Sequence, residues 1–153
     1  MLRKMGKALR IISDEDKKNI AIILDGPTIL PDFEIYKLGI LKDALSEIGT
    51  IRTGKVIFDM QITQKESNLL SDQGFQEEIV GSDVDIHLTI SILEYMNSQS
   101  IDIIGIGTTD PNLYPVYARI KKEKKLLLIS WKENVTQAME SIADYILYLD
   151  YLK

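Results

Sequence analysis

The 153 residues suit one ordinary domain, and 45% of them are hydrophobic, which is enough to form a substantial core. There is no cysteine, which excludes a disulfide framework and a thiolate metal site and fits a reducing cytoplasm. The net charge of −5 argues against nucleic-acid binding over the whole surface, and no apolar run approaches the roughly 20 residues that a membrane span needs. We therefore expect a single-domain cytoplasmic protein without a membrane contact.

The first 18 residues are predicted to form an amphipathic helix and a polar connector, set apart from a folded domain at residues 19–153. Leu2, Met5, Leu9 and Ile12 recur at helical spacing, with basic residues between them. Polar residues then lead into the first predicted strand. Such a helix could pack on its own domain or on a partner.

Strands and helices alternate through the rest of the chain. The first strand, residues 19–25, holds five apolar residues in a row and ends at Asp25-Gly26-Pro27, which is typical of a central strand covered on both faces. The spacing of the elements predicts a doubly wound α/β domain, with a mainly parallel sheet of five to six strands and helices on both faces. The later strands are expected at 55–60, 76–80, 101–107, 126–131 and 145–149, and the helices at 36–48, 64–71, 84–97, 111–122 and 135–143.

Three aspartates are expected at one edge of this sheet. If the strand order is 3-2-1-4-5, the first and fourth strands are neighbours, and ligands bind beyond their carboxyl ends. Asp25 ends the first strand, Asp110 follows the fourth, and Asp85 stands in the first turn of the helix after the third. Three carboxylates repel one another unless a cation lies between them, and sites made only of oxygen ligands suit Mg²⁺ or Mn²⁺. A metal in this place can activate water for phosphoryl displacement.

Each of these acids also has a purely structural explanation. Asp110 directly before Pro111 is a good helix N-cap. Ser82 with Asp85 three residues later resembles a capping box, and Asp25 with its following glycine resembles a turn. A turn and helix caps account for each acid separately. They do not explain why all three acids would meet in one crevice.

Four sequence motifs, or phrases, lie close to predicted strands: Asp25-Gly26-Pro27; Gly74-Phe75 leading to Asp83-Val84-Asp85-Ile86; Thr108-Thr109-Asp110-Pro111-Asn112-Leu113-Tyr114-Pro115-Val116; and Ala143-Asp144-Tyr145-Ile146. In this order they resemble the NYN domain of the LabA type, a branch of the PIN-like nucleases. The resemblance runs from about residue 19 to 149. It implies a PIN-like sheet with an acidic metal pocket and, as in many members, cleavage of RNA that depends on Mg²⁺ or Mn²⁺.

Three positions depart from the family pattern. The first phrase usually continues with Asn, where this chain has Thr28, and the fourth-strand phrase usually carries a second acid, where this chain has Asn112. The long helix often carries an acid at the position of Ser91. Asn112 could still offer a carbonyl oxygen to a cation, but it adds no negative charge. Asp59 and Asp83 could compensate, although both are interpreted first as surface or capping residues.

Two functions are therefore open. The first is a Mg²⁺- or Mn²⁺-dependent ribonuclease that acts on single-stranded or structured RNA. Its expected metal ligands, of which the three aspartates are also the catalytic residues, are Asp25, Asp85, Asp110 and Asn112. The hydroxyls of Thr28 and Thr108 would support them through hydrogen bonds. The second function is a catalytically inactive module that binds RNA or protein, with dimerisation through the N-terminal helix as one arrangement.

Three further features of the sequence bear on its function. Arg119, Lys121 and Lys122 form a basic group that is either a nucleic-acid patch or a solvated face, and the solvated face is the simpler interpretation. His87, the single histidine, is expected to lack a serine or cysteine partner, which argues against a nucleophilic triad. The glycines at 105 and 107 do not form a dinucleotide fingerprint, because Asp110 stands where the third glycine belongs.

Overall fold

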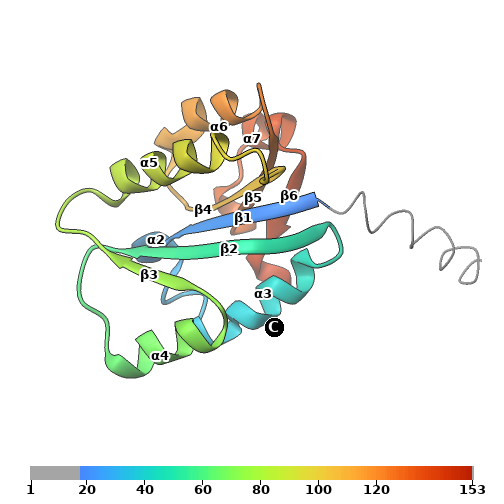
Figure 1. Ribbon diagram of the computed structural model, residues 1–153. Coiled ribbons are helices and arrows are strands. Elements are labelled where there is room, and N and C mark those ends of the chain that lie inside the picture. Colours follow the sequence, from blue (N-terminus) through green and yellow to red (C-terminus); the bar gives the residue numbers. More distant parts are fainter. Residues whose placement is uncertain (1–17, 153) are drawn as a thin grey trace, which may run out of the picture.

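The structure, a computed structural model, describes residues 18–152 and consists of one twisted sheet between two layers of helices (Figure 1). The amphipathic helix predicted at the start of the chain lies outside the described residues. No helix within residues 18–152 has the length and apolar character that a membrane crossing requires.

The sheet has six strands, all parallel, in the order β3-β2-β1-β4-β5-β6. This confirms the predicted α/β fold and the reversal of winding between β1 and β4, with β6 added at the edge beside β5. The strands are β1 (Lys18–Asp25), β2 (Gly49–Phe58), β3 (Gln76–Ile79), β4 (Ile103–Gly107), β5 (Lys125–Ser130) and β6 (Tyr145–Tyr148).

Helices α5, α6 and α7 cover one face of the sheet, and α3 and α4 cover the other (Figure 1). The α-helices are α2 (Gly26–Ile29), α3 (Leu38–Leu45), α4 (Gln64–Asp72), α5 (Val84–Met96), α6 (Tyr114–Ile120) and α7 (Gln137–Ile142). Single turns of 3-10 helix occur at η1 (Ile35–Lys37), η2 (Pro111–Leu113), η3 (Lys132–Asn134) and η4 (Leu149–Tyr151).

Strand β1 lies at the centre of the sheet and contributes to both hydrophobic cores. Ile20, Ile22 and Leu24 pack into the core beneath α2, α3 and α4, whereas Ala21 and Ile23 pack into the core beneath α5, α6 and α7. Successive side chains of a strand point to opposite faces, so an unbroken apolar run is what a strand buried on both sides requires. The carboxyl end of this strand places Asp25 at the position where the winding reverses.

The structure corrects several local predictions. Strand β2 begins at Gly49, six residues before its predicted start, because its polar first half pairs with β1 from Lys18 onward. The segment after Asp25, where the sequence indicated a turn, forms the short helix α2, and the helix predicted at 111–122 is divided into η2 and α6. The proposed capping box is also wrong: Asp83 is the N-cap of α5, and its side chain makes no capping hydrogen bond.

Gly74 ends α4 with a φ of +82°, in the left-handed region that side chains disfavour. We expect Gly74→Ala to lower the free energy of unfolding by about 1 kcal/mol, measured as a lower denaturant midpoint at an unchanged slope. Gly81→Ala is the control, because a Cβ there would meet no atom within 4 Å. Equal midpoints for the two variants would contradict this account of Gly74.

Candidate acidic site

Five aspartates line one pocket of about 400 Å³ at the carboxyl edge of the sheet. Asp25 ends β1, and the other four, which follow β2, β3 and β4, are Asp59, Asp83, Asp85 and Asp110. The structure thus brings together the three aspartates predicted from the strand order. It adds Asp59 and Asp83, which the sequence offered as compensating acids but which were interpreted first as surface or capping residues.

Asp25 lies at the buried end of this pocket, with only 4% of its surface exposed. The Thr108 hydroxyl donates a hydrogen bond of 2.9 Å to its Oδ2. Burial raises the pKa of the Asp25 carboxyl and the negative charge of Asp110 adds to this, while hydrogen bonds from Thr108 and Thr28 act in the opposite direction. Because burial is the largest cause, the ionised carboxylate is destabilised where it stands.

Two threonines join the end of β1 to the segment after β4. The Thr28 hydroxyl accepts a hydrogen bond from the backbone N–H of Thr109 at 3.2 Å and lies 3.4 Å from the Thr108 hydroxyl. Thr108 Oγ1 in turn accepts from the backbone N–H of Asp110 at 3.1 Å. These contacts fix the backbone on either side of Asp25 and Asp110, which is the supporting position expected for both threonines.

Asp110 has the capping contact predicted from its sequence position, because its Oδ1 accepts from the backbone N–H of Asn112 at 2.9 Å. Asn112 itself does not line the acidic pocket. It lines a neighbouring pocket between α5 and η2, together with Asp85 and Leu113. The turn of η2 therefore carries Asn112 away from the position beside Asp110 that the fourth-strand phrase suggested.

Tyr117 of α6 is the aromatic side chain beneath this site. It is 1% exposed, and burial together with the charges of Asp110 and Asp25 raises the pKa of its hydroxyl. Its ring packs edge to face on Tyr114, with 6.5 Å between the ring centroids. Tyr117 therefore serves as core packing.

The polar side chains that line the acidic pocket offer only oxygen atoms. Carboxylates and the hydroxyls of Thr28 and Ser82 line it, without imidazole or thiolate groups, and such oxygen ligands match Mg²⁺ or Mn²⁺. Within residues 18–152, no group of three or more acidic, histidine or cysteine side chains is close enough to hold an ion directly as placed. The carboxylates fit the chemistry of a cation whose remaining ligands are waters, as is usual for Mg²⁺.

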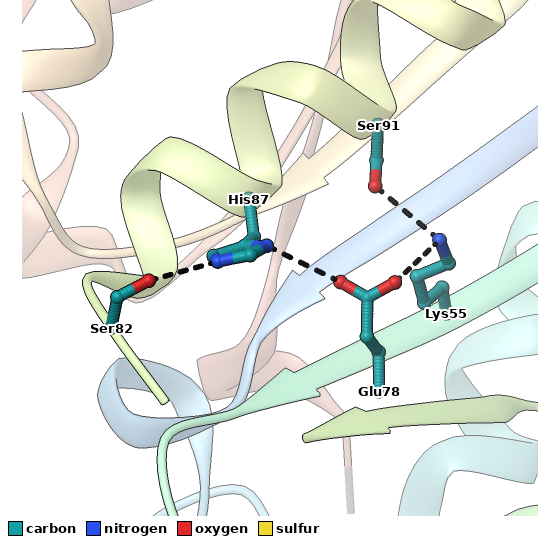
Figure 2. A network of polar contacts seen from close by, with 5 residues as sticks. All are labelled: Lys55, Glu78, Ser82, His87 and Ser91. Carbon is teal, nitrogen blue, oxygen red and sulfur yellow. Dashed lines mark hydrogen bonds and ion pairs between the residues drawn. The ribbon is translucent and has the colours of Figure 1, made fainter. Parts of the chain in front are cut away.

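A chain of polar contacts runs from the rim of this pocket along β3 and α5 (Figure 2). Ser82 Oγ lies 2.9 Å from His87 Nε2, so the expectation that His87 lacks a serine partner is wrong. Glu78 Oε2 lies 4.0 Å from His87 Nδ1, and Glu78 Oε1 lies 3.2 Å from Lys55 Nζ. Lys55 Nζ also donates to Ser91 Oγ at 3.3 Å.

This network is not a nucleophilic triad. The 4.0 Å between Glu78 and His87 exceeds hydrogen-bond distance, so the carboxylate does not orient the imidazole as a triad requires. Ser82 also lines a pocket of five carboxylates, which would repel the oxyanion of an acyl-transfer reaction. The network instead fastens the first turn of α5 to the end of β3 and so positions the segment that carries Asp83 and Asp85.

Ser91 stands where the resembled family often has an acid, and it is outside the acidic pocket. Its side chain is 3% exposed and faces the ammonium group of Lys55. Lys55 also forms an ion pair with Glu78. The absence of an acid at position 91 therefore removes no carboxylate from the five that line the pocket.

The basic group predicted as a nucleic-acid patch lies at the opposite, amino edge of the sheet. Lys121 and Lys122 line a polar pocket there with Lys18, the first residue of β1. Two of the charges are paired: Lys121 Nζ lies 2.7 Å from Asp144, and Arg119 lies 3.4 Å from Glu123. None of these three basic residues lines the acidic pocket.

Comparison with known proteins adds evidence on the fold and leaves the activity open. No family model matches the chain. An uncharacterized protein of Methanocaldococcus jannaschii is 31% identical over 129 residues, which cover 84% of this chain and 54% of that protein. A protein of unknown function from Vibrio parahaemolyticus, whose crystal structure is known, has a TM-score of 0.72 at 17% identity, covering 88% of this chain and 94% of the other. That likeness shows the fold alone, and the chain spans only about half the length of its relative from Methanocaldococcus.

Proposed function

We propose that the chain is a cytoplasmic PIN-like domain of the NYN type, whose acidic pocket binds Mg²⁺ or Mn²⁺ and cleaves RNA phosphodiesters. The observation that carries this proposal is the burial of Asp25 in a pocket that four more aspartates line. A buried carboxylate is costly unless it is paired, and a divalent cation would supply the missing charge. The sequence phrases that resemble the NYN family support the same assignment.

Each residue of the pocket would have its own role in binding the cation or positioning the reaction. Asp25 and Asp110 would hold the cation directly or through water, and Asp85 would complete the shell or orient the attacking water. The hydroxyl of Thr108 holds the carboxylate of Asp25 in place by its hydrogen bond. A bound divalent cation supplies water activation and charge stabilisation for an in-line phosphoryl displacement. Asn112 is left out of this set because it lines the neighbouring pocket.

Cleavage of labelled single-stranded RNA with Mn²⁺ or Mg²⁺ tests the proposal. We expect cleavage that EDTA abolishes and that Asp110→Asn lowers by about 100-fold, because one carboxylate ligand is lost. Asp72→Asn is the matched control, since Asp72 ends α4 on an exposed surface outside the pocket. Cleavage that persists in EDTA, or that Asp110→Asn leaves unchanged, would overturn the assignment.

The second candidate is a module that binds RNA or protein without cleaving it. It is favoured by the loss of the second acid at Asn112 and by the spacing of the carboxylates in the pocket, which are not preassembled around an ion. A native protein that binds the labelled RNA but leaves it intact with either cation would support this candidate over the ribonuclease.

A further inference from the structure

A second pocket of about 420 Å³ adjoins the acidic one, and the two share Pro27 and Asp59 in their walls. It lies between α2, η1 and the segment that follows β2. Most of its lining is apolar, and the side chains that matter here are those of Tyr36, Phe58 and Met60. A pocket of this size and lining, with a few polar groups, is typical of a small-molecule site.

Two of these side chains are unusually exposed for their size. Met60 is 69% exposed and Tyr36 is 57% exposed, while Phe58 beneath them is only 7% exposed. Single exposed apolar residues are common on protein surfaces and need no explanation. Here Tyr36 and Met60 line one concave site together with the buried Phe58. A flat ligand in this site would meet the two aromatic rings and the thioether of Met60.

The polar groups of this pocket are acidic and neutral. They are the carboxylates of Glu34, Asp59 and Glu66 and the amide of Gln61, and the lining includes no lysine or arginine. The Glu66 carboxylate already accepts hydrogen bonds from the backbone N–H and hydroxyl of Thr63, and Glu34 lies 3.6 Å from Lys37. Asp59 has no hydrogen bond or ion pair within residues 18–152, so its carboxylate is the acceptor available to a ligand.

We propose that this pocket binds one nucleobase of a single-stranded RNA, next to the phosphate at the acidic pocket. The inference rests on the proposed function for its substrate class, and the shared wall of Pro27 and Asp59 supplies the continuity between base and phosphate. Stacking on Tyr36 and Met60 explains the exposed apolar surface. A phosphate or an acyl chain is a poor occupant, since either would leave the Asp59 carboxylate repelled or unpaired.

The carboxylate of Asp59 also selects among bases. Adenine, cytosine and guanine carry an exocyclic amino group that donates to a carboxylate, whereas uracil carries no amino group and has a carbonyl oxygen where cytosine has its amino group. The pocket should therefore prefer adenine and cytosine to uracil. This preference distinguishes base recognition from unspecific apolar contact.

The test uses the full chain with labelled methionine methyl groups and no metal, titrated with adenosine, cytidine, uridine and ribose. We expect adenosine and cytidine to shift the Met60 methyl signal in NMR spectra, uridine to shift it less, and ribose to leave it unchanged. Tyr36→Ala should weaken adenosine binding by about 10-fold through the lost stacking. Leu93→Ala is the matched control, because Leu93 is 46% exposed on α5, outside both pockets.

Three results would overturn the inference: a Met60 signal that no nucleoside shifts, an equal response to ribose, or equal weakening by Tyr36→Ala and Leu93→Ala. Failure of this inference and failure of the proposed function are distinguishable. Nucleoside binding is measured without metal, so it stands if cation-dependent cleavage is absent. Cleavage that Tyr36→Ala leaves unchanged, without any Met60 shift, would remove the base site and keep the ribonuclease.

Discussion

Replacing Asp25 by Asn is expected to abolish cation-dependent RNA cleavage and, at the same time, to stabilise the metal-free protein. The amide keeps the size of the carboxylate and can still accept the hydrogen bond from Thr108. It removes the charge that burial and Asp110 disfavour. We expect turnover to fall by at least about 100-fold. The melting temperature should rise by about 2–4 °C for each kcal/mol gained in a domain of this size.

The stabilisation should depend on pH in a defined direction. The pKa of Asp25 in the folded protein is raised above its ordinary value of 3.8, so ionisation favours the unfolded chain. Below pH 3.8 both states are protonated and the native protein loses nothing from this group. As the pH rises through the folded pKa, the native protein loses stability that Asp25→Asn keeps. The difference in melting temperature between the two proteins should therefore be small below pH 3.8 and reach a plateau above the folded pKa of Asp25.

The same melting experiment can be repeated with a divalent cation present. Mg²⁺ or Mn²⁺ should raise the melting temperature of the native protein, because a ligand of the folded state alone stabilises it, and should have little effect on Asp25→Asn. The surface variant Asp72→Asn should behave like the native protein in both measurements. A melting temperature that falls in Asp25→Asn at neutral pH, or a cation effect that persists in it, would contradict the role given to this carboxylate.

The acidic pocket was predictable because its members stand at strand ends. In a parallel sheet all carboxyl ends meet at one edge, so the apolar run before Asp25 and the one before Thr108-Thr109-Asp110 were enough to bring these acids together. The same reasoning explains why the basic group at Lys121 and Lys122 lies elsewhere: it precedes β5 and so belongs to the amino edge.

The features that sequence reasoning missed depend on the paths of short connecting segments. The contact between Ser82 and His87 depends on the bend between β3 and α5, which makes Asp83 the cap and leaves Ser82 free to face the imidazole. Asn112 is displaced because η2 is a tight 3-10 turn. The apolar pocket is lined by Tyr36 and Met60, which lie in two different connecting segments and are 24 positions apart in the chain. Hydrophobic periodicity describes helices and strands and carries no information about such pairings.

Gly26→Ala is expected to have the largest effect on stability among the variants considered. A Cβ at this position would lie 2.6 Å from the carbonyl oxygen of Ile57 and 2.8 Å from the ring of Phe58. The first contact is with the backbone of β2, which cannot rotate away as a side chain can. Overpacking of this kind costs typically 1–3 kcal/mol, and we expect a loss of about 2–3 kcal/mol in the free energy of unfolding.

Denaturant unfolding of Gly26→Ala and Gly39→Ala would measure this effect against a matched glycine. A Cβ at Gly39 would make an ordinary contact of 3.5 Å with the side chain of Gln73, so alanine inside α3 should stabilise the protein by about 0.5–1 kcal/mol. The two substitutions should therefore shift the midpoint in opposite directions. Because Phe58 also lines the apolar pocket and Gly26 follows Asp25, the alanine at 26 should weaken adenosine binding too. A Gly26→Ala protein with native stability would show that the backbone of β2 can move to make room for the added Cβ. Native nucleoside binding by that variant would show that a change beside Asp25 does not reach the apolar pocket.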